Sequence, residues 1–300
     1  MQFNDRDEII ALTPQWKGER FDDGRPKVED KYLKALKTLT LEEVWKPIFV
    51  KGYESQFEGR LHTLHDDGRK LIGRAVTATY CPFRPDLDEV VKNVGRSENR
   101  TGTYNQWVID NLQEGDVPVI DMYDKIYKGT FLGGNLTTAL QKHTKTGGAV
   151  IWGGVRDVEQ MKKVPDVQVY YRGIDPTPIR EFVMKDWNDI TNFGGAVCLP
   201  GDVVFGAGGG VLFIPSHLVA DVVEGAAKTH VKDDFGFEMI CQGKFTTAQI
   251  DKNTWTEEML DMLLEWIKTD PRGEEYRDLD WSKEYDLARN GDPNDTQTAL

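Results

Sequence analysis

The sequence contains little cysteine and no long hydrophobic run. Only Cys81, Cys198 and Cys241 occur in 300 residues, and their odd number and wide spacing argue against a disulfide framework or a zinc cluster. The longest apolar stretches have the length of a strand, so none is expected to span a bilayer. The first ten residues are charged and lack the apolar run of a signal peptide. We therefore expect a reduced, cytoplasmic protein without membrane association.

Positive charge is also scarce. Lysine and arginine number 37 against 50 aspartate and glutamate residues, which leaves a formal net charge of −13 at pH 7. Nucleic-acid binding draws much of its affinity from basic side chains that neutralise phosphates, so this balance argues against a nucleic-acid partner. The acidic excess indicates solubility and leaves the substrate open.

The densest glycine cluster, at 206–210, lacks the features of a nucleotide site. It has neither the lysine of a phosphate-binding loop nor the spacing of a dinucleotide fingerprint. It lies between two strand-like runs, 202–205 and 211–214, so we predict a hairpin turn there. The lack of a Rossmann fingerprint also argues against a methyltransferase or a dehydrogenase.

The central part of the chain alternates short apolar runs with amphipathic segments. Helical spacing is found at 136–143 and 218–227. Strands that alternate with helices indicate an α/β core, which we place at residues 71–230. Runs of strand length and strand composition lie at 73–80, 117–122, 149–152, 167–171 and 211–215.

An N-terminal extension is expected at residues 1–70. This segment is polar and rich in helical patterns, with leucines at suitable spacing between 31 and 45. Thr40 and Glu43 have the spacing of a capping box, which predicts a helix start at this point.

A C-terminal extension is expected at residues 231–300. We predict a helix at 254–267, with Thr254 and Glu257 as its capping box. The last segment, 268–300, is charged and poor in aliphatic residues. It is expected either to be disordered or to lie over a neighbouring subunit.

One strand-to-helix junction carries the clearest chemical signal. The buried-type strand at 149–152 runs through glycines into Arg156 and Asp157, ahead of a predicted helix at 158–163. One interpretation is an N-cap aspartate beside a surface arginine. The other is a ligand site, because α/β folds bind ligands where strands end. An aspartate oxygen suits Mg²⁺, and the arginine suits a carboxylate or an enolate oxygen.

A second junction, Gly133-Gly134-Asn135, precedes the predicted helix at 136–142. Two glycines allow the backbone to approach a ligand, and a helix start offers free N–H groups to an anion. The alternative is an ordinary tight loop with Asn135 as the cap. Together the two junctions offer a cation site, an arginine and an anion-binding turn, which suit a 2-keto acid and its enolate.

These motifs resemble the RraA-like family over about residues 70–230. The matching segments are Gly73-Arg74-Ala75-Val76-Thr77, Gly115-Asp116-Val117, Gly133-Gly134, Gly154-Val155-Arg156-Asp157 and Pro200-Gly201-Asp202-Val203-Val204. That family includes 4-hydroxy-4-methyl-2-oxoglutarate/4-carboxy-4-hydroxy-2-oxoadipate aldolases and non-catalytic regulators of ribonuclease E. The resemblance implies a swivelling β/β/α fold, assembled as a homotrimer or a dimer of trimers with active sites between subunits.

The resemblance also implies roles for individual residues. Asp157 would bind Mg²⁺ or Mn²⁺, and Arg156 would contact the keto acid and stabilise its enolate. The backbone at Gly133, Gly134, Asn135 and Leu136 would hold the substrate carboxylate.

One departure concerns the catalytic base. Asn135 stands where the family's aldolases have an acidic residue, and an amide is no general base. We name Glu58, from a neighbouring subunit, as a candidate replacement. Asp121 and Asp124 follow the strand at 117–122 and are weaker candidates.

The sequence therefore supports a metal-dependent lyase that acts on a small 2-keto acid. Retro-aldol release of pyruvate is the leading hypothesis, and oxaloacetate decarboxylation could use the same enolate. One alternative is a dehydratase or hydratase of a 2-keto-3-deoxy sugar acid. The other is a non-catalytic regulator that binds an RNA-processing enzyme.

Overall fold

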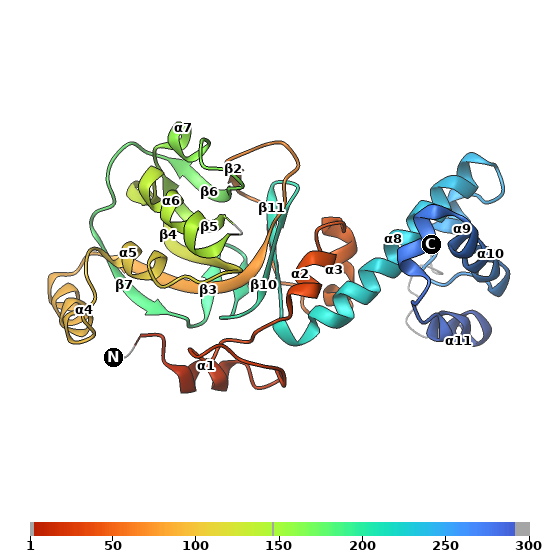
Figure 1. The fold of residues 1–300 in the computed structure, drawn as a ribbon, viewed down its shortest axis with the longest axis horizontal. Coiled ribbons are helices and arrows are strands. Elements are labelled where there is room, and N and C mark those ends of the chain that lie inside the picture. Colours follow the sequence, from red (N-terminus) through yellow and green to blue (C-terminus); the bar gives the residue numbers. More distant parts are fainter. Residues whose placement is uncertain (1–2, 146, 292–300) are drawn as a thin grey trace. The chain divides into compact units, whose positions relative to one another are not determined.

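The computed structural model describes residues 3–145 and 147–291. The chain divides into two compact units, Met1–Ala220 and Asp221–Leu300 (Figure 1). The sequence suggested three segments, with boundaries near 70 and 230. In the structure the first 70 residues belong to the first unit together with the α/β core.

The first unit mixes helices and strands, as expected for an α/β protein. Its helices are α1 (Arg6–Leu12), α2 (Asp30–Ala35), α3 (Leu41–Phe49), α4 (Pro85–Ser97), α5 (Tyr104–Ile109), α6 (Gly134–Thr144), α7 (Val158–Met161) and the 3-10 turn η1 (Ser216–Leu218). Its strands are β1 (Phe57–Glu58), β2 (His62–Thr63), β3 (Leu71–Pro82), β4 (Asp116–Leu132), β5 (Gly148–Val155), β6 (Gln168–Ile174), β7 (Phe182–Trp187), β8 (Thr191–Phe193), β9 (Ala196–Cys198), β10 (Val203–Ala207) and β11 (Gly210–Ile214).

Within the described residues, nine strands form one sheet in the order β1-β11-β10-β3-β4-β5-β6-β2, with β7 paired to β3. The central strands β3, β4, β5 and β6 are parallel, and the outer strands pair antiparallel. Parallel neighbours require crossover connections, which α5 and α6 help to supply. Because the parallel strands run the same way, the C-terminal ends of β4 and β5 lie at one edge.

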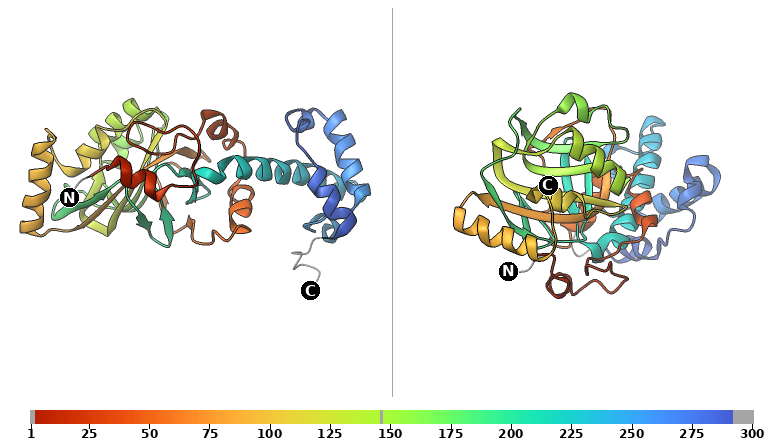
Figure 2. Two further views of the ribbon diagram at one scale, coloured as in Figure 1. Left: turned by 90° about the horizontal axis from the view of Figure 1, so that it is seen from below. Right: turned by 60° about the vertical axis from the view of Figure 1, so that its left-hand side comes forward.

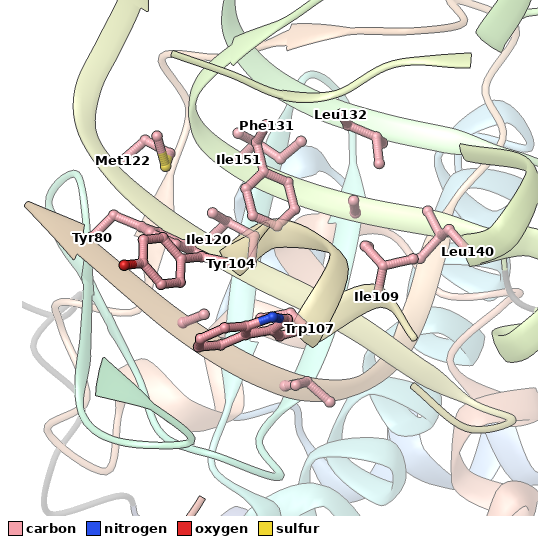
Figure 3. Close-up of a cluster of buried hydrophobic side chains, with 14 of the residues drawn as sticks. Tyr80, Tyr104, Trp107, Ile109, Ile120, Met122, Phe131, Leu132, Leu140 and Ile151 are labelled. Carbon is pink, nitrogen blue, oxygen red and sulfur yellow. The ribbon is translucent and has the colours of Figure 1, made fainter. Parts of the chain in front are cut away.

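The strand side chains alternate between two buried layers. Val119 and Val150 face a layer that also contains Phe193, from the small β8-β9 sheet. Ile120 and Ile151 face the opposite layer, which α5 and α6 cover (Figure 3). Burial of the sheet on both faces explains why the sequences of these strands are nearly continuous apolar runs.

The N-terminal segment is joined to the sheet rather than standing apart as a helical extension. β1 and β2, which the sequence did not predict, pair with β11 and β6. The guanidinium of Arg25 pairs with Asp116 at 2.8 Å, and both side chains are buried. The predicted capping box of Thr40 and Glu43 is confirmed at the start of α3.

The second unit is helical. Its core is shared by the long helix α8 and the helices that follow it, and Figure 2 shows α10 and α11 side by side. The helices are α8 (Val219–Cys241), α9 (Thr247–Ile250), α10 (Glu257–Thr269), the 3-10 turn η2 (Pro271–Tyr276) and α11 (Ser282–Asn290).

Two predictions for this region were wrong in detail. Thr256, not Thr254, caps α10, and its hydroxyl accepts a hydrogen bond from the Met259 amide at 3.3 Å. Trp255 is buried in the helical core and donates to the Ile250 carbonyl, so the helix begins only after it.

Residues 268–291 are folded within the second unit, so the expectation of disorder was wrong for them, while the alternative of a segment lying over a neighbouring subunit stays a prediction. Tyr276 and Trp281 are buried against α10. Aromatic side chains bury a large apolar area, so a count of aliphatic residues underestimated this core. Residues 292–300, the rest of that prediction, lie outside the described residues.

The glycine cluster forms the predicted hairpin. β10 and β11 pair antiparallel up to Ala207 and Gly210. Gly208 and Gly209 have φ values of 59° and 82°, which suit the two central positions of a tight hairpin turn. In the described parts of the chain, no helix has the length and apolar character needed to cross a membrane.

Candidate active site

Asp157 stands at the junction between β5 and α7 and is the N-cap residue of α7, but its side chain makes no capping hydrogen bond. Its backbone is left-handed, with φ 56° and ψ 36°, and its side chain accepts no hydrogen bond from α7. Its Oδ2 instead accepts from the Gly134 amide at 3.3 Å. The N-cap position of Asp157 is therefore confirmed, whereas capping by its carboxylate is not observed. Left-handed backbone at a non-glycine residue is uncommon and often marks a functional site.

Gly133 and Gly134 allow the two junctions to approach each other. β4 ends at Leu132, and Gly133 is the N-cap of α6. A Cβ atom on Gly133 would lie 2.7 Å from Oδ2 of Asp157 and 3.2 Å from Cγ of Arg156. The φ of Gly133 is −144°, a backbone conformation that any residue can adopt. The requirement for glycine at 133 therefore comes from the lack of space for a side chain.

We expect Gly133→Ala to lower activity far more than stability. The new methyl group would push the Asp157 carboxylate and the Arg156 side chain apart, and both are partly exposed and able to shift. A displacement near 1 Å in a catalytic site can cost about 100-fold in rate. Parallel measurements of turnover and melting temperature test this. Gly208→Ala is the control for the loss of a glycine, because a Cβ at this hairpin position meets no atom within 4 Å. Equal losses of activity in Gly133→Ala and Gly208→Ala would contradict the expectation.

The start of α6 presents unused backbone donors. The Gly134 amide faces Asp157, and the Thr137 amide bonds to the Gly133 carbonyl. Among the described residues, the amides of Asn135 and Leu136 meet no protein acceptor. Together with the helix dipole they favour an anion such as a carboxylate.

A cavity of about 180 Å³ opens beside these donors. Arg156 is in its wall, and the Arg156 amide is fixed by a 3.0 Å hydrogen bond to the Leu132 carbonyl. The guanidinium Nη1 lies 3.7 Å from Oδ2 of Asp157. The cavity is lined by Thr103, Asn105, Gln106, Thr130, Phe131, Gly133, Asn135, Leu136, Arg156, Pro178 and Ile179.

The single carboxylate at Asp157 is compatible with a magnesium ion. Across residues 3–145 and 147–291, no three His, Cys, Asp or Glu side chains gather as metal ligands, whereas zinc and calcium sites recruit several protein ligands. Mg²⁺ keeps several waters and often takes only one or two carboxylates. The Asp157 side chain is 33% exposed, so one of its oxygens remains open to such an ion.

Glu58 does not line this cavity within one chain. Its carboxylate accepts hydrogen bonds from the Arg60 guanidinium at 2.7 and 2.9 Å, from the Arg60 amide at 2.8 Å and from the Gly195 amide at 2.8 Å. The hydrogen bonds from the Arg60 side chain are the main reason that the pKa of Glu58 falls to about 2. A carboxylate of such low pKa is a weak base near neutral pH.

The two aspartates after the strand at 117–122 also lie outside the cavity lining. β4 continues through them to Leu132. Asp124 pairs with Arg172 at 2.9 Å, and Asp121 accepts from the Tyr123 amide at 2.8 Å. Burial raises the pKa of Asp121. Their contacts within the chain are therefore structural.

Sequence reasoning missed the opposite wall of the cavity. Thr103 and Gln106 at the start of α5 belong to it, as do Pro178 and Ile179 in the loop after β6. The Thr103-x-x-Gln106 spacing was available as a helix-start signal, and the structure contains that capping box. The sequence pattern could not predict that α5 lies beside α6, because the contact joins segments about 30 residues apart in the chain.

The family relationship follows from the comparisons. The model of the RraA-like family, described as Aldolase/RraA, matches residues 39–213. The chain belongs to this family. The family includes aldolases that depend on Mg²⁺ and inhibitors of RNase E, and its members form trimers. The match begins before β1, so it includes residues 39–70 of the segment expected to be an extension.

One relative is a distant one. Protein DlpA of Legionella pneumophila subsp. pneumophila (strain Philadelphia 1 / ATCC 33152 / DSM 7513) is 29% identical over 157 residues, which is 52% of this chain and 23% of DlpA. The match thus spans about a quarter of that relative's length.

Two solved structures show the same fold. An uncharacterized protein from Pseudomonas syringae pv. tomato str. DC3000 superposes with a TM-score of 0.60 at 19% identity, over 74% of this chain and 93% of its own. RraAS2 of Streptomyces coelicolor, an unusual member of the RNase ES inhibitor RraA protein family, gives 0.56 at 19% identity, over 73% of this chain and 98% of its own. The predicted RraA-like α/β fold is confirmed.

Proposed function

We propose that this RraA-like protein is a divalent-metal-dependent lyase that releases pyruvate from a 2-keto acid through an enolate. The observation that supports this most is the position of the Asp157 carboxylate. It is turned away from its own helix toward the Gly134 amide and lies 3.7 Å from the Arg156 guanidinium. Left-handed backbone at a non-glycine residue often accompanies a functional site, and the carboxylate makes no hydrogen bond to its own helix.

Each part of the site has a role in this proposal. The amides of Asn135 and Leu136 hold the substrate carboxylate. Arg156 contacts the keto oxygen, where negative charge develops as the enolate forms. A magnesium or manganese ion held by Asp157 would supply Lewis-acid polarisation of the keto group.

In retro-aldol cleavage the C3–C4 bond breaks and its electron pair forms the enolate. The C4 hydroxyl loses its proton and becomes a carbonyl, and protonation of C3 then gives pyruvate. Asn135 does not accept the hydroxyl proton, and the described residues lining the cavity include no carboxylate or imidazole. Glu58 of a neighbouring subunit, in a homotrimer or a dimer of trimers, stays our candidate. It would act only after releasing Arg60, since that ion pair keeps its pKa near 2.

A pyruvate-release assay tests the proposal. The full chain is incubated with 4-hydroxy-2-keto acids and with Mg²⁺, Mn²⁺ or a chelator, and pyruvate is measured with a coupled dehydrogenase. We expect release that requires the metal. Oxaloacetate is assayed in parallel, because loss of CO₂ forms the same enolate without removing a hydroxyl proton. Activity on oxaloacetate alone would indicate that the site forms the enolate but lacks the base that removes the hydroxyl proton.

Two other outcomes would redirect the function. Loss of water from a 2-keto-3-deoxy sugar acid, without pyruvate release, would indicate the dehydratase. The replacement of the family's acidic residue by Asn135 favours this dehydratase variant, and a non-catalytic regulator is the candidate from a different functional class. Absence of metal-dependent turnover on every substrate, together with binding to an RNA-processing ribonuclease, would support the regulator and overturn the lyase.

A further inference from the structure

Two prolines flank the residue that precedes the apolar wall of the cavity. The segment 175–179, after β6, has the sequence Asp-Pro-Thr-Pro-Ile, and its last two residues line the cavity together with Arg156. Proline has no backbone N–H group, so Thr177 supplies every hydrogen-bond donor between the two prolines. The attachment of this stretch to the rest of the site therefore depends strongly on one residue.

Both donors of Thr177 are directed to Asp175. The Thr177 amide donates to Oδ1 of Asp175 at 2.9 Å, and the Thr177 hydroxyl donates to the same oxygen. These hydrogen bonds, the one from the hydroxyl first, lower the pKa of Asp175, so this acceptor is charged near neutral pH. The Asp175 amide in turn donates to the Val155 carbonyl at 3.1 Å. Because Val155 precedes Arg156 and Asp157, the hydrogen bonds begin at the strand end that carries these two residues.

The acceptors of Thr177 connect it to β4. Its hydroxyl accepts from the Lys128 amide at 2.9 Å, and its carbonyl accepts from the Thr130 hydroxyl at 2.5 Å. Thr130 is 2% exposed and lines the cavity. Gly133, where the anion-binding turn begins, follows three residues later. Thr177 thus links the ends of β4 and β5, the two strands that lead into the candidate site.

The part of β4 that Thr177 contacts is irregular. The pairing of β4 with β5 changes register between Lys125 and Thr130, and Lys128 has a left-handed φ of 54°. Such a conformation at a non-glycine residue costs about 1–3 kcal/mol and persists only where the surroundings impose it. The hydrogen bond from the Lys128 amide to Thr177, and the one that the Lys128 carbonyl accepts from the Arg180 amide at 2.9 Å, are contacts that can impose it.

From these contacts we infer that Thr177 is a positioning residue that holds the wall of Pro178 and Ile179 at a fixed distance from Arg156 and Asp157, an inference that rests on the proposed function. Thr177 is not part of the cavity lining, so it acts on the substrate through the residues that it holds. Its hydrogen bonds lie within one chain, so the role does not depend on what a neighbouring subunit or a metal adds to the site.

Thr177→Val tests the inference. Valine keeps the branched shape but lacks the hydroxyl that contacts Lys128 and Asp175. The substrate is the 2-keto acid turned over best among 4-hydroxy-2-ketoglutarate, 4-hydroxy-2-ketobutanoate and oxaloacetate. We expect its KM to rise about tenfold, the size of one good hydrogen bond. The change in kcat should stay within about threefold, because a wall that confines substrate and transition state alike affects binding alone.

Thr177→Ser is the rescue variant, because serine keeps the hydroxyl. We expect its KM to return close to that of the unmodified chain. An unchanged KM in Thr177→Val, or a KM in Thr177→Ser that is raised as much as in Thr177→Val, would overturn the inference.

Thr144→Val is the matched control. The Thr144 hydroxyl also joins two backbone groups, since it donates to the Leu140 carbonyl at 2.9 Å and accepts from the Gly147 amide at 3.1 Å. Thr144 is buried at the last residue of α6, whereas the candidate site uses the first residues of that helix. We expect the control to lower the melting temperature at least as much as Thr177→Val and to leave KM unchanged. An equal rise of KM in both variants would show a general effect of lost stability and would contradict the positioning role.

Amide hydrogen exchange without substrate separates this inference from the proposed function. Peptides that cover residues 175–181 should exchange about fivefold faster in Thr177→Val and at the original rate in Thr144→Val, since an ordinary hydrogen bond changes local opening by about this factor. Faster exchange with an unchanged KM would exclude the wall from the substrate site and so refute the inference. Failure of the lyase proposal looks different, because the unmodified chain would then release no pyruvate from any substrate, whatever the exchange rates are.

Discussion

Asp157→Asn should lower metal-dependent pyruvate release by about 100- to 1,000-fold, because charge stabilisation by a bound metal contributes several kcal/mol to such reactions. Asparagine keeps the size of the side chain and an oxygen that can accept from the Gly134 amide. It also tolerates the left-handed backbone of this position. The substitution removes the negative charge that holds the cation, so the melting temperature should change little.

The measurement combines turnover at saturating Mg²⁺ with calorimetric titration of Mn²⁺. Glu159→Gln is the control, since Glu159 is an exposed carboxylate two residues away on α7 and its loss makes the same change in net charge. Unchanged turnover and unchanged Mn²⁺ affinity in Asp157→Asn would remove the metal site from the proposal.

Asp116→Asn is expected to destabilise the first unit by about 3 kcal/mol, the lower end of the range for breaking a buried ion pair. The side chains of Arg25 and Asp116 are 1% and 0% exposed and lie 2.8 Å apart. Without the carboxylate, Asp23, at 2.7 Å, is the anionic neighbour that the guanidinium would retain among the described residues. The N-terminal segment would then lose its buried ion pair with the sheet.

Urea unfolding of the full chain, followed by tryptophan fluorescence, measures this effect. Glu114→Gln is the control, because Glu114 pairs with Lys145 on the surface, where both side chains are about two-thirds exposed. Exposed pairs contribute little to stability, so the midpoint should hardly move. Similar midpoints for the two variants would show that the buried pair does not anchor the segment.

Local patterns predicted most of the sheet. The runs at 73–80, 117–122 and 149–152 lie within β3, β4 and β5, and the run at 167–171 overlaps β6, which begins at Gln168. A parallel sheet that is buried on both faces requires apolar residues at almost every strand position. A continuous apolar run of strand length therefore indicates such a buried strand. The short edge strands β1 and β2 were missed because two residues carry no periodicity.

The candidate site was predictable only in part. The adjacency of Arg156 and Asp157, and the two glycines before α6, are visible in the linear sequence. The orientation of Asp157 toward Gly134 is not, because the same aspartate before a helix is equally compatible with capping. The choice depends on the backbone conformation that β4 and β5 impose together.

The sequence by itself determined the family, the parallel core and the identity of the anionic and cationic side chains beside the cavity, since these depend on local periodicity and short spacings. Only the tertiary structure decided that Glu58 is bound to Arg60 and Gly195 and that Gln106 and Thr130 line the cavity. Those contacts join segments distant in sequence, and their formation depends on how α5, β4 and the sheet edges pack.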